Sequence, residues 1–461
     1  MASLGLGSGN AQRTRRRVDR RLMPFIFMLY LVSYLDRFNI GSAALQMTRE
    51  LGFSDSVFGL GSGLFFVSYV ALGIPGAVLA ELWSARKWIA AILITWGILA
   101  SATAFIHNAA QFYSLRFSLG LAEAGFVPGI IVYLSHWYRR EDRGKAIALF
   151  FAAIPASQVL GGPLAAVLLR IHWMDLSGWR WLLLLEGLPA MGLGFASLFY
   201  LTERPGDAKW LPPEEREWLT NELAREHNSI AGPERQAQPR PSERGLGQPR
   251  PSGRGLGVSS ALGDPRVWLL CAILFMGLNS NYGVSLWLPQ MVQRLSAFDV
   301  SRVSLIATIP SLCALPLMLL TGWHSDRTGE RIWHTAIPRL VSAASLFLSF
   351  VSTAAGHLWI SVAMLSLATV GFYCSHPGFW PLPNLFLGPA AAAASIGLIN
   401  SCGNLGGFFG TYLLGAISDR TGTFGPGLLY LAACSLASGL LVLLVRLNGS
   451  SVMASGKEPE S

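Results

Sequence analysis

The stretch MPFIFMLYLVSYLDRFNIGSAAL, residues 23–45, is long and apolar enough to cross a lipid bilayer as a single helix. Within it, Asp36 and Arg37 place a carboxylate next to a guanidinium. A charged side chain near the bilayer centre costs about 2.5–3.5 kcal/mol on insertion scales, and it is found mainly where function requires it. The stretch therefore predicts a membrane-spanning helix that carries part of a functional site.

Composition extends this prediction to the whole chain. Of its 461 residues, 52% are hydrophobic and 13% are charged, against about 25% charged residues in soluble domains. The net charge of +9 comes mostly from arginines in short polar segments, so nucleic acid is not predicted as a partner. The five cysteines lie in apolar segments without CxxC spacing and are interpreted as core residues, so neither a disulfide nor a metal site is predicted.

Windows of about 20 residues predict twelve membrane spans. The spans are predicted to be helices, because alternating strand patterns are absent and backbone polar groups in lipid must be paired within their own segment. They are residues 22–45, 57–80, 88–107, 111–137, 145–171, 180–201, 266–292, 301–323, 335–356, 358–379, 390–416 and 426–446. The predicted fold class is an all-α membrane protein with twelve transmembrane helices.

A long polar segment divides these spans six and six. The predicted parts are a basic tail at 1–21, an N-terminal half at 22–202, a linker at 203–264, a C-terminal half at 265–446 and a second tail at 447–461. The linker begins with an amphipathic segment that predicts a short helix at 213–227. It also holds a tandem repeat, QPRPSERGLG (238–247) and QPRPSGRGLG (248–257), whose composition predicts disorder.

Arginines predict the orientation. They are concentrated in the N-terminal tail, and the loops at 86–87, 139–145 and 327–331 are also basic. By the positive-inside rule these loops, the linker and both termini face the cytoplasm. The first apolar run is too long for a cleavable signal peptide, so the predicted location is the plasma (inner) membrane.

The loop GWHSDRTGER at 322–331 has the pattern G-x-x-x-D-R-x-G-x-R. An aspartate at one helix end beside arginines at the next can latch two helices, and the pattern is interpreted as a gating motif. Its residues are Gly322, Asp326, Arg327, Gly329 and Arg331. A degraded copy follows the second span, with Glu81-Leu82 at the Asp-Arg positions, and a third echo, GAISDRTG, occupies 415–422.

Two such motifs at matched places, twelve spans and a central linker resemble the major facilitator superfamily from end to end. The resemblance implies two six-helix halves around a central midplane cavity that binds the substrate.

Few ionisable residues lie inside the predicted spans. Besides Asp36 and Arg37 they are Arg116, Glu123, Glu186 and Arg339. Arg116 and Glu123 are seven residues apart, so they share a helix face about 10.5 Å apart along the axis. Arg339 is expected to reach water at a helix end. For Glu186, a structural partner such as Arg180 is expected.

Several strings resemble the anion:cation symporter family more specifically, which includes proton-coupled carriers of sugar acids, tartrate and phthalate. They are YLDRFNIG, RFSLGLAEAGFVPG, GWRWLLLLEGLP, INSCGNLGGFFGTYLLG and DAKWLPPEEREWL. By this resemblance, Arg37 and Arg116 bind the substrate anion, and Asp36 and Glu123 are the carboxylates that take up protons.

The residues support this assignment independently. Arginine stays charged at working pH and forms forked bonds to carboxylates. Permanent salt bridges between helices remain the alternative interpretation of these charges. Further polar residues either bond substrate hydroxyls or hold helices together; they are Ser157, Gln158, Asn279, Asn281, Tyr282, Asn400 and Asn404.

The predicted function is secondary active import of a small organic anion by proton symport, with alternating access and no cofactor, by a monomer. One alternative is a proton-driven exporter of amphipathic compounds, which is disfavoured because such exporters carry GPxxGG where this chain has GGPLAAV at 161–167. Another is an organophosphate:phosphate exchanger, which is disfavoured because the seventh span contains no inner arginine. The last is a transporter-like receptor. No nucleophile–base set stands out, so an enzyme is not predicted.

Overall fold

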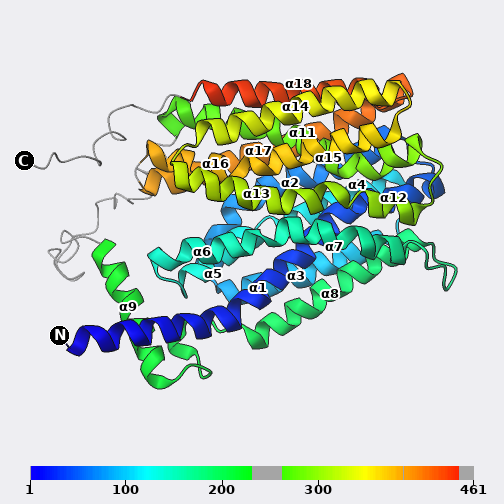
Figure 1. Ribbon diagram of the computed structural model, residues 1–461. Coiled ribbons are helices and arrows are strands. Elements are labelled where there is room, and N and C mark those ends of the chain that lie inside the picture. The colour runs from blue at the N-terminus through cyan, green and yellow to red at the C-terminus, as the bar shows by residue number, and fades with distance from the viewer. Residues whose placement is uncertain (1, 231–261, 388, 446–461) are drawn as a thin grey trace, which may run out of the picture. The chain divides into compact units, whose positions relative to one another are not determined.

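The computed structural model describes residues 2–230, 262–387 and 389–445, and these residues are almost entirely helical (Figure 1). They divide into two compact units. Unit 1 comprises Met1–Phe53, Leu64–Arg250 and Phe298–Thr308, and unit 2 comprises Ser54–Gly63, Pro251–Ala297 and Ile309–Ser461. The tandem repeat at 238–257 lies outside the described residues.

The helices up to residue 230 are α1 (Ala2–Leu51), α2 (Asp55–Leu82), α3 (Ala85–Thr103), α4 (Ala109–Glu123), α5 (Phe126–Ser135), α6 (Arg140–Phe151), α7 (Ala153–Leu168), α8 (Gly178–Tyr200), η1 (Pro205–Asp207) and α9 (Pro213–Ile230). The later ones are α11 (Pro265–Leu295), α12 (Val300–Ile306), α13 (Ile309–Thr328), α14 (Ile332–Ala354), α15 (Leu358–Cys374), α16 (His376–Phe379), η4 (Leu382–Leu385), α17 (Pro389–Thr421) and α18 (Gly425–Leu443).

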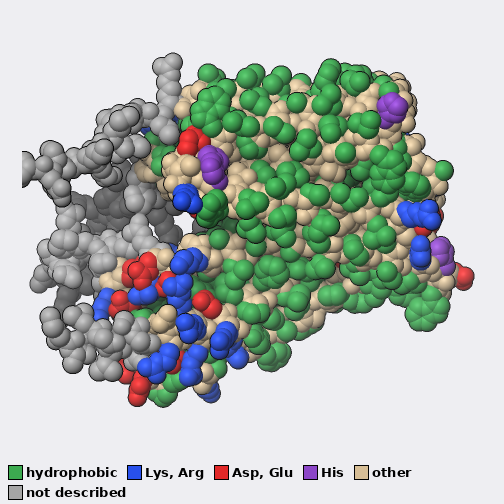
Figure 2. Space-filling view, viewed as in Figure 1, with side chains coloured by type: hydrophobic (Ala, Val, Ile, Leu, Met, Phe, Trp, Pro, Cys, Tyr) green, Lys and Arg blue, Asp and Glu red, His purple; other side chains and the backbone are tan. Residues whose placement is uncertain are grey.

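Ten helical segments among the described residues are long and apolar enough to cross a membrane. The two remaining predicted spans, 22–45 and 390–416, lie within α1 and α17. The prediction of an all-α membrane fold is confirmed. Exposed apolar side chains cover the flanks of the helices in Figure 2, while charged side chains gather near the N-terminal part of α1 and near α9.

Four predicted spans are each interrupted by a short break that was not predicted from the sequence. The breaks separate α4 from α5, α6 from α7, α12 from α13, and α15 from α16. A proline follows each break, and proline has no N–H to bond the carbonyl four residues earlier. The carbonyls that therefore lack this bond are those of Ala124, Phe151, Ile306 and Tyr373, four residues before Pro128, Pro155, Pro310 and Pro377. Each lies within one residue of the end of the first helix of its pair.

The N-terminal arginines belong to α1, which begins 20 residues before the predicted span. Arg15 pairs with Asp142 at the start of α6 (2.6 Å), and Arg17 pairs with Glu215 of α9 (3.4 Å). Tyr138 donates a hydrogen bond to Asp19 (2.8 Å). The predicted linker helix is confirmed as α9, which is three residues longer than expected.

In unit 2, α11 and α17 pack at backbone contact. A Cβ atom on Gly406 would lie 2.1 Å from the carbonyl oxygen of Phe275, and one on Gly410 would lie 2.0 Å from that of Asn279. Gly406 and Gly410 of the string INSCGNLGGFFGTYLLG are therefore required by close packing of these two helices.

Candidate functional site

Four charged side chains from α1 and α4 are buried in unit 1. Asp36 and Arg37 are each 3% exposed, Arg116 is 2% exposed and Glu123 is 1% exposed. Two carboxyl groups and two guanidinium groups balance one another in charge. Such a balance offsets part of the cost of removing charges from water.

The ion pair in this cluster joins the two helices. Arg37 Nη2 bonds Glu123 Oε1, and the hydroxyl of Ser33 donates to the same oxygen (2.9 Å). The second oxygen of Glu123, Oε2, is buried without a hydrogen-bond partner among the described residues. The pairing therefore runs between α1 and α4, although Arg37 follows Asp36 in sequence.

Arg116 and Arg37 approach the same aromatic ring. The guanidinium carbon of Arg116 lies 5.1 Å from the centroid of Phe65, and that of Arg37 lies 4.9 Å from it. Arg116 Nε is buried without a hydrogen-bond partner among the described residues. Asp36 accepts a hydrogen bond from the indole of Trp96 (3.1 Å), and its charge also acts on Arg116. Arg116 Nε is thus a buried donor without an acceptor among the described residues.

Gly120 brings α4 close enough for this arrangement. A Cβ atom at this position would lie 2.2 Å from the carbonyl oxygen of Phe65 and 2.1 Å from the hydroxyl of Ser68. A residue larger than glycine at position 120 would push α4 away from α2, and Arg116 would move away from the Phe65 ring.

The expected pairing of Glu186 with Arg180 is wrong. Arg180 pairs with Glu50 (3.0 Å) and donates to the carbonyl of Ala104 (2.6 Å). Glu186 instead accepts a hydrogen bond from the amide of Asn39. The sequence analysis missed Asn39, although its place three residues after Asp36 on α1 was a usable signal, since such residues share a helix face.

The expectation for Arg339 is also wrong. Arg339 is 1% exposed and does not reach water at the helix end. It donates to the carbonyl of Ile273 (2.9 Å) and to the hydroxyl of Ser438. Gly277 makes room for it, because a Cβ atom there would lie 2.3 Å from Arg339 Nη1. The backbone carbonyl replaces water as the acceptor.

The other candidate binding residues lie in both units. In unit 1, Ser157 donates to the carbonyl of Ile154 on its own helix (2.7 Å), and Gln158 is half-buried on α7. In unit 2, Asn279 donates to the hydroxyl of Tyr430 (2.6 Å). Asn281 and Tyr282 are buried on α11, and Asn404 donates to the carbonyl of Asn400 (2.8 Å).

The predicted gating motif, at 322–331, forms a compact turn between α13 and α14. Asp326 pairs with Arg331 across the turn (2.7 Å), and Arg327 stacks on Trp323 with 5.4 Å to the ring centroid. Gly329 has a φ of +69°, which favours glycine. A Cβ atom on Gly322 would lie 3.3 Å from Pro377.

The third echo, at the end of α17, caps another helix. The carboxylate of Asp419 accepts from the backbone N–H groups of Asp55 (2.9 Å) and Ser56 (2.7 Å), at the start of α2. Asp55 in turn bonds Arg294 (2.5 Å) and the hydroxyl of Ser418 (2.6 Å). Burial raises the pKa of Asp419, but the hydrogen bonds from Ser56 and Asp55 outweigh it and hold the pKa below its ordinary value.

Asp419→Ala is expected to lower the free energy of unfolding by about 0.5–2 kcal/mol, because the start of α2 loses its cap. A lowered folded-state pKa stabilises the fold above the ordinary aspartate pKa of about 3.9 and loses this effect as the pH falls below it. Thermal melts between neutral and acid pH measure both effects, and the stability difference between parent and variant should shrink at acid pH.

Asp326→Ala is the matched control, because this aspartate occupies the same place in the other SDRTG sequence but is 75% exposed. An exposed ion pair contributes only about 0–1 kcal/mol. Equal losses in the two variants at neutral pH would show that capping by Asp419 does not stabilise the fold.

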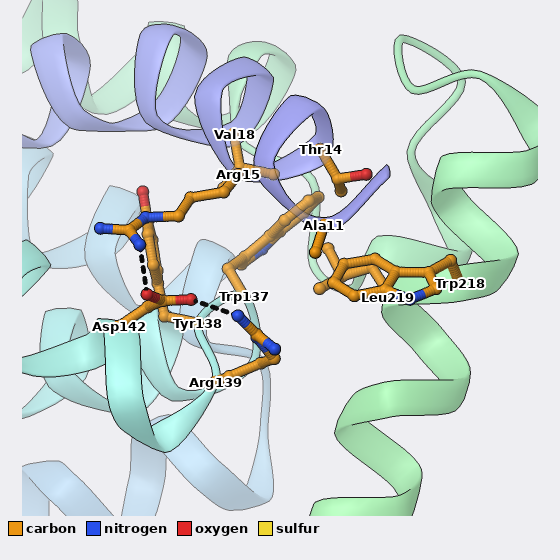
Figure 3. A pocket seen from close by; sticks show the side chains of 10 residues that line it. All are labelled: Ala11, Thr14, Arg15, Val18, Trp137, Tyr138, Arg139, Asp142, Trp218 and Leu219. Carbon is orange, nitrogen blue, oxygen red and sulfur yellow. Dashed lines mark hydrogen bonds and ion pairs between the residues drawn. The ribbon is translucent and has the colours of Figure 1, made fainter. Parts of the chain in front are cut away.

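A small cavity lies elsewhere in unit 1, among α1, α6 and α9 (Figure 3). Its volume is about 20 Å³, which is enough for about one water molecule. Arg15 and Arg139 both point at Asp142 beside it, and Trp218 of α9 closes one side. This cavity joins the start of α1 to α9 and is too small to hold a transported molecule.

The apolar helices and the balanced charges buried inside unit 1 define a polytopic membrane transport protein. The model of the Major Facilitator Superfamily matches residues 26–411. The chain belongs to this superfamily.

Individual proteins of known name are also similar to this chain. The chain is 42% identical to a protein of Agrobacterium vitis named "Putative tartrate transporter", over 94% of this chain and 91% of that protein. It is 35% identical to a quinolone resistance transporter of Acinetobacter baumannii, over 93% and 94%. The solved structure of the xylose transporter XylE from E. coli superposes with a TM-score of 0.70 at 14% identity, covering 92% of this chain and 97% of that one. That likeness shows a shared fold.

Proposed function

We propose that the protein imports a small organic anion, a carboxylate or sugar acid, together with protons. The observation that carries this proposal is the pair of buried guanidinium groups at the Phe65 ring. Arg37 is held by Glu123, whereas Arg116 keeps a buried Nε–H without a hydrogen-bond partner among the described residues. An anion supplies the acceptor that this donor lacks.

Two guanidinium groups suit a carboxylate with further oxygens. Each planar guanidinium can form two parallel bonds to a carboxylate. Tyr34 and Tyr69 also line Arg37, with its guanidinium carbon 4.7 and 5.1 Å from their ring centroids. The name of the Agrobacterium relative supports tartrate, a hydroxylated dicarboxylate, as the first compound to test.

Proton coupling follows from charge balance in the same cluster. An arriving carboxylate competes with Glu123 for Arg37 and adds negative charge to a group that sums to zero when empty. Glu123 then lies in buried surroundings without its partner, where the protonated form of a carboxyl group is favoured. One proton for each added negative charge restores the balance, so that the loaded protein carries no unpaired charge through the membrane. Permanent ion pairs between helices are the alternative that the tests must exclude.

Contacts in unit 1 support the proposed orientation in the inner membrane, with both termini in the cytoplasm. The N-terminal part of α1, the start of α6 and α9 contact one another through Arg15, Arg17 and their acidic partners. These segments were all assigned to the cytoplasm from their arginines. In the proposed orientation, the end of α1 and the start of α8 face the outside. These two segments also contact one another, since Glu50 and Arg180 form an ion pair.

The proposal is tested with purified protein in sealed lipid vesicles. An inward proton gradient should drive labelled tartrate to a higher concentration inside than outside, and a protonophore should abolish this accumulation. Phthalate and sugar acids serve as competitors that define the substrate class. Absence of uptake of every organic anion, in vesicles whose protein is correctly folded, would contradict the proposed function.

The quinolone resistance relative supports a second candidate, proton-driven export of amphipathic compounds. The same vesicles separate the two functions. Export by proton antiport moves the compound out of the compartment into which protons flow, whereas symport moves the compound with the protons. A quinolone extruded against its gradient, with no accumulation of tartrate, would establish the second candidate.

A further inference from the structure

Glu186 is a buried carboxyl group that the proposed function does not yet use. Its side chain is on α8 and is 3% exposed. Oε1 accepts a hydrogen bond from the amide of Asn39, and Oε2 is buried without a hydrogen-bond partner among the described residues. An ionised carboxylate normally needs several donors or a cation to be buried.

Among the residues that the structure describes, no cation is placed to neutralise Glu186. The helices packed against α8 are α1, α3 and α7. From α1, Asn39 bonds Glu186 and Asp36 acts on it with a charge of the same sign. The titratable side chains of α3 are Arg86 and Lys87 in its first turn, and the sequence of α7 contains none. Arg180, on α8 itself, is bonded to Glu50.

A count of the buried charges gives the same result. Arg180 is also buried but is paired with Glu50. Apart from that pair, Asp36, Glu123 and Glu186 are three carboxyl groups of this cluster, whereas Arg37 and Arg116 are two guanidinium groups. The arginines balance two of the acids, and the third lies with Asn39. A proton on Glu186 is therefore the simplest way to keep this part of unit 1 neutral.

We propose that Glu186 is a third proton-binding carboxyl group of the transporter, and that it binds and releases one proton in each transport cycle. The release step rests on the proposed function, because it needs proton-coupled transport. Asn39 suits both states of Glu186. Its amide N–H donates to the ionised carboxylate, and its amide oxygen accepts from the protonated carboxyl group once the amide has turned.

The position of Asn39 links Glu186 to the anion site. Asn39 lies two residues after Arg37 on α1, in the stretch YLDRFNIG. An anion that draws Arg37 away from Glu123 acts on α1. The same helix carries Asn39, whose amide holds Glu186. A movement of α1 that breaks the Arg37–Glu123 ion pair therefore also changes the hydrogen bond between Asn39 and Glu186. Glu186 releases its proton when this movement lets water reach the carboxyl group.

The first measurement is infrared spectroscopy of the purified protein at neutral pH without substrate. The parent should show the carbonyl stretching band of a protonated carboxyl group, and Glu186→Gln, which is nearly isosteric, should lack this component. Asn39→Leu should keep the band and move its position, because the hydrogen bond is lost. Glu50→Gln is the control and should leave the band unchanged, since Glu50 is ion-paired with Arg180.

The second measurement is tartrate accumulation at equilibrium in vesicles with one pH unit across the membrane. One pH unit corresponds to a factor of about 10 for each coupled proton. Glu186→Gln should therefore accumulate tartrate about tenfold less than the parent, while exchange of labelled for unlabelled tartrate continues. Glu50→Gln should accumulate it like the parent.

The outcomes separate this proposal from the proposed function. A band that persists in Glu186→Gln would show that Glu186 carries no proton. Loss of the band with accumulation at the parent level would show a permanently protonated residue and overturn its part in coupling. If the parent transports no organic anion, the proposed function fails and the proton-release step fails with it. The infrared band still decides whether Glu186 binds a proton.

Discussion

Arg116→Ala is expected to abolish measurable tartrate binding. Truncating one member of a buried, charge-assisted contact costs about 2–5 kcal/mol, so the affinity should fall at least about 30-fold. The structure favours Arg116 over Arg37 for this test. Removing Arg37 would break its ion pair with Glu123 and leave that carboxylate buried without its bonded cation, a change that destabilises proteins by about 3–5 kcal/mol. Removing Arg116 breaks no hydrogen bond at Nε, and Asp36 and Glu123 interact with it through charge.

Arg116→Lys should restore only part of the affinity, because an ammonium group cannot form the forked pair of bonds. Calorimetric titration with tartrate measures both variants, after a thermal melt has confirmed that they are folded. Arg302→Ala is the control, since this arginine is 72% exposed on α12. Parent-like affinity in folded Arg116→Ala protein would remove Arg116 from the anion site and with it the observation that carries the proposed function.

Glu123→Gln and Asp36→Asn are expected to uncouple transport while leaving anion exchange in place. The amide variants keep the volume of each side chain but cannot bind and release a proton. Glutamine at 123 can still accept from Ser33, which donates to the carboxylate in the parent (2.9 Å). Arg37 loses its fixed anionic partner, so tartrate meets less competition for the guanidinium and should bind at least as tightly.

The measurement compares two assays on the same vesicles. Exchange of labelled for unlabelled tartrate should continue in both variants, while accumulation should fall about tenfold per pH unit for each coupled proton that is lost. The Glu50→Gln variant again serves as control. If both variants concentrate tartrate like the parent, these carboxyl groups hold helices together and the proton moves through other groups.

Much of the fold could be predicted because the solvent itself imposes it. Backbone groups in lipid must bond within their own segment, so a long apolar run specifies a helix whatever its neighbours are. The span of α8, predicted at 180–201 and found at Gly178–Tyr200, illustrates this. The helix breaks near Pro128, Pro155 and Pro310 could not be predicted from proline alone. Each proline removes one hydrogen bond, yet Pro163 and Pro189 lie inside unbroken helices.

The sequence by itself determined which side chains are expensive to place in a membrane, and so it identified Asp36, Arg37, Arg116, Glu123 and Glu186 as residues that need an explanation. It did not determine their partners. Asp36 and Arg37 are neighbours in the chain, yet Arg37 bonds Glu123 on α4 and Asp36 accepts from Trp96 on α3.

Only the tertiary structure decided these pairings, because the rotation of each helix about its axis and the closeness of its neighbours select which charges meet. Gly120 shows how small the determining feature can be, since its missing side chain lets α4 approach α2 to backbone contact. The same holds for Glu186. Arg180, its expected partner, pairs with Glu50 instead, and Glu186 bonds Asn39. The cost of burying a charged side chain depends on the residue and its segment, and can be predicted from the sequence. The residue that pairs with it depends on how the helices pack.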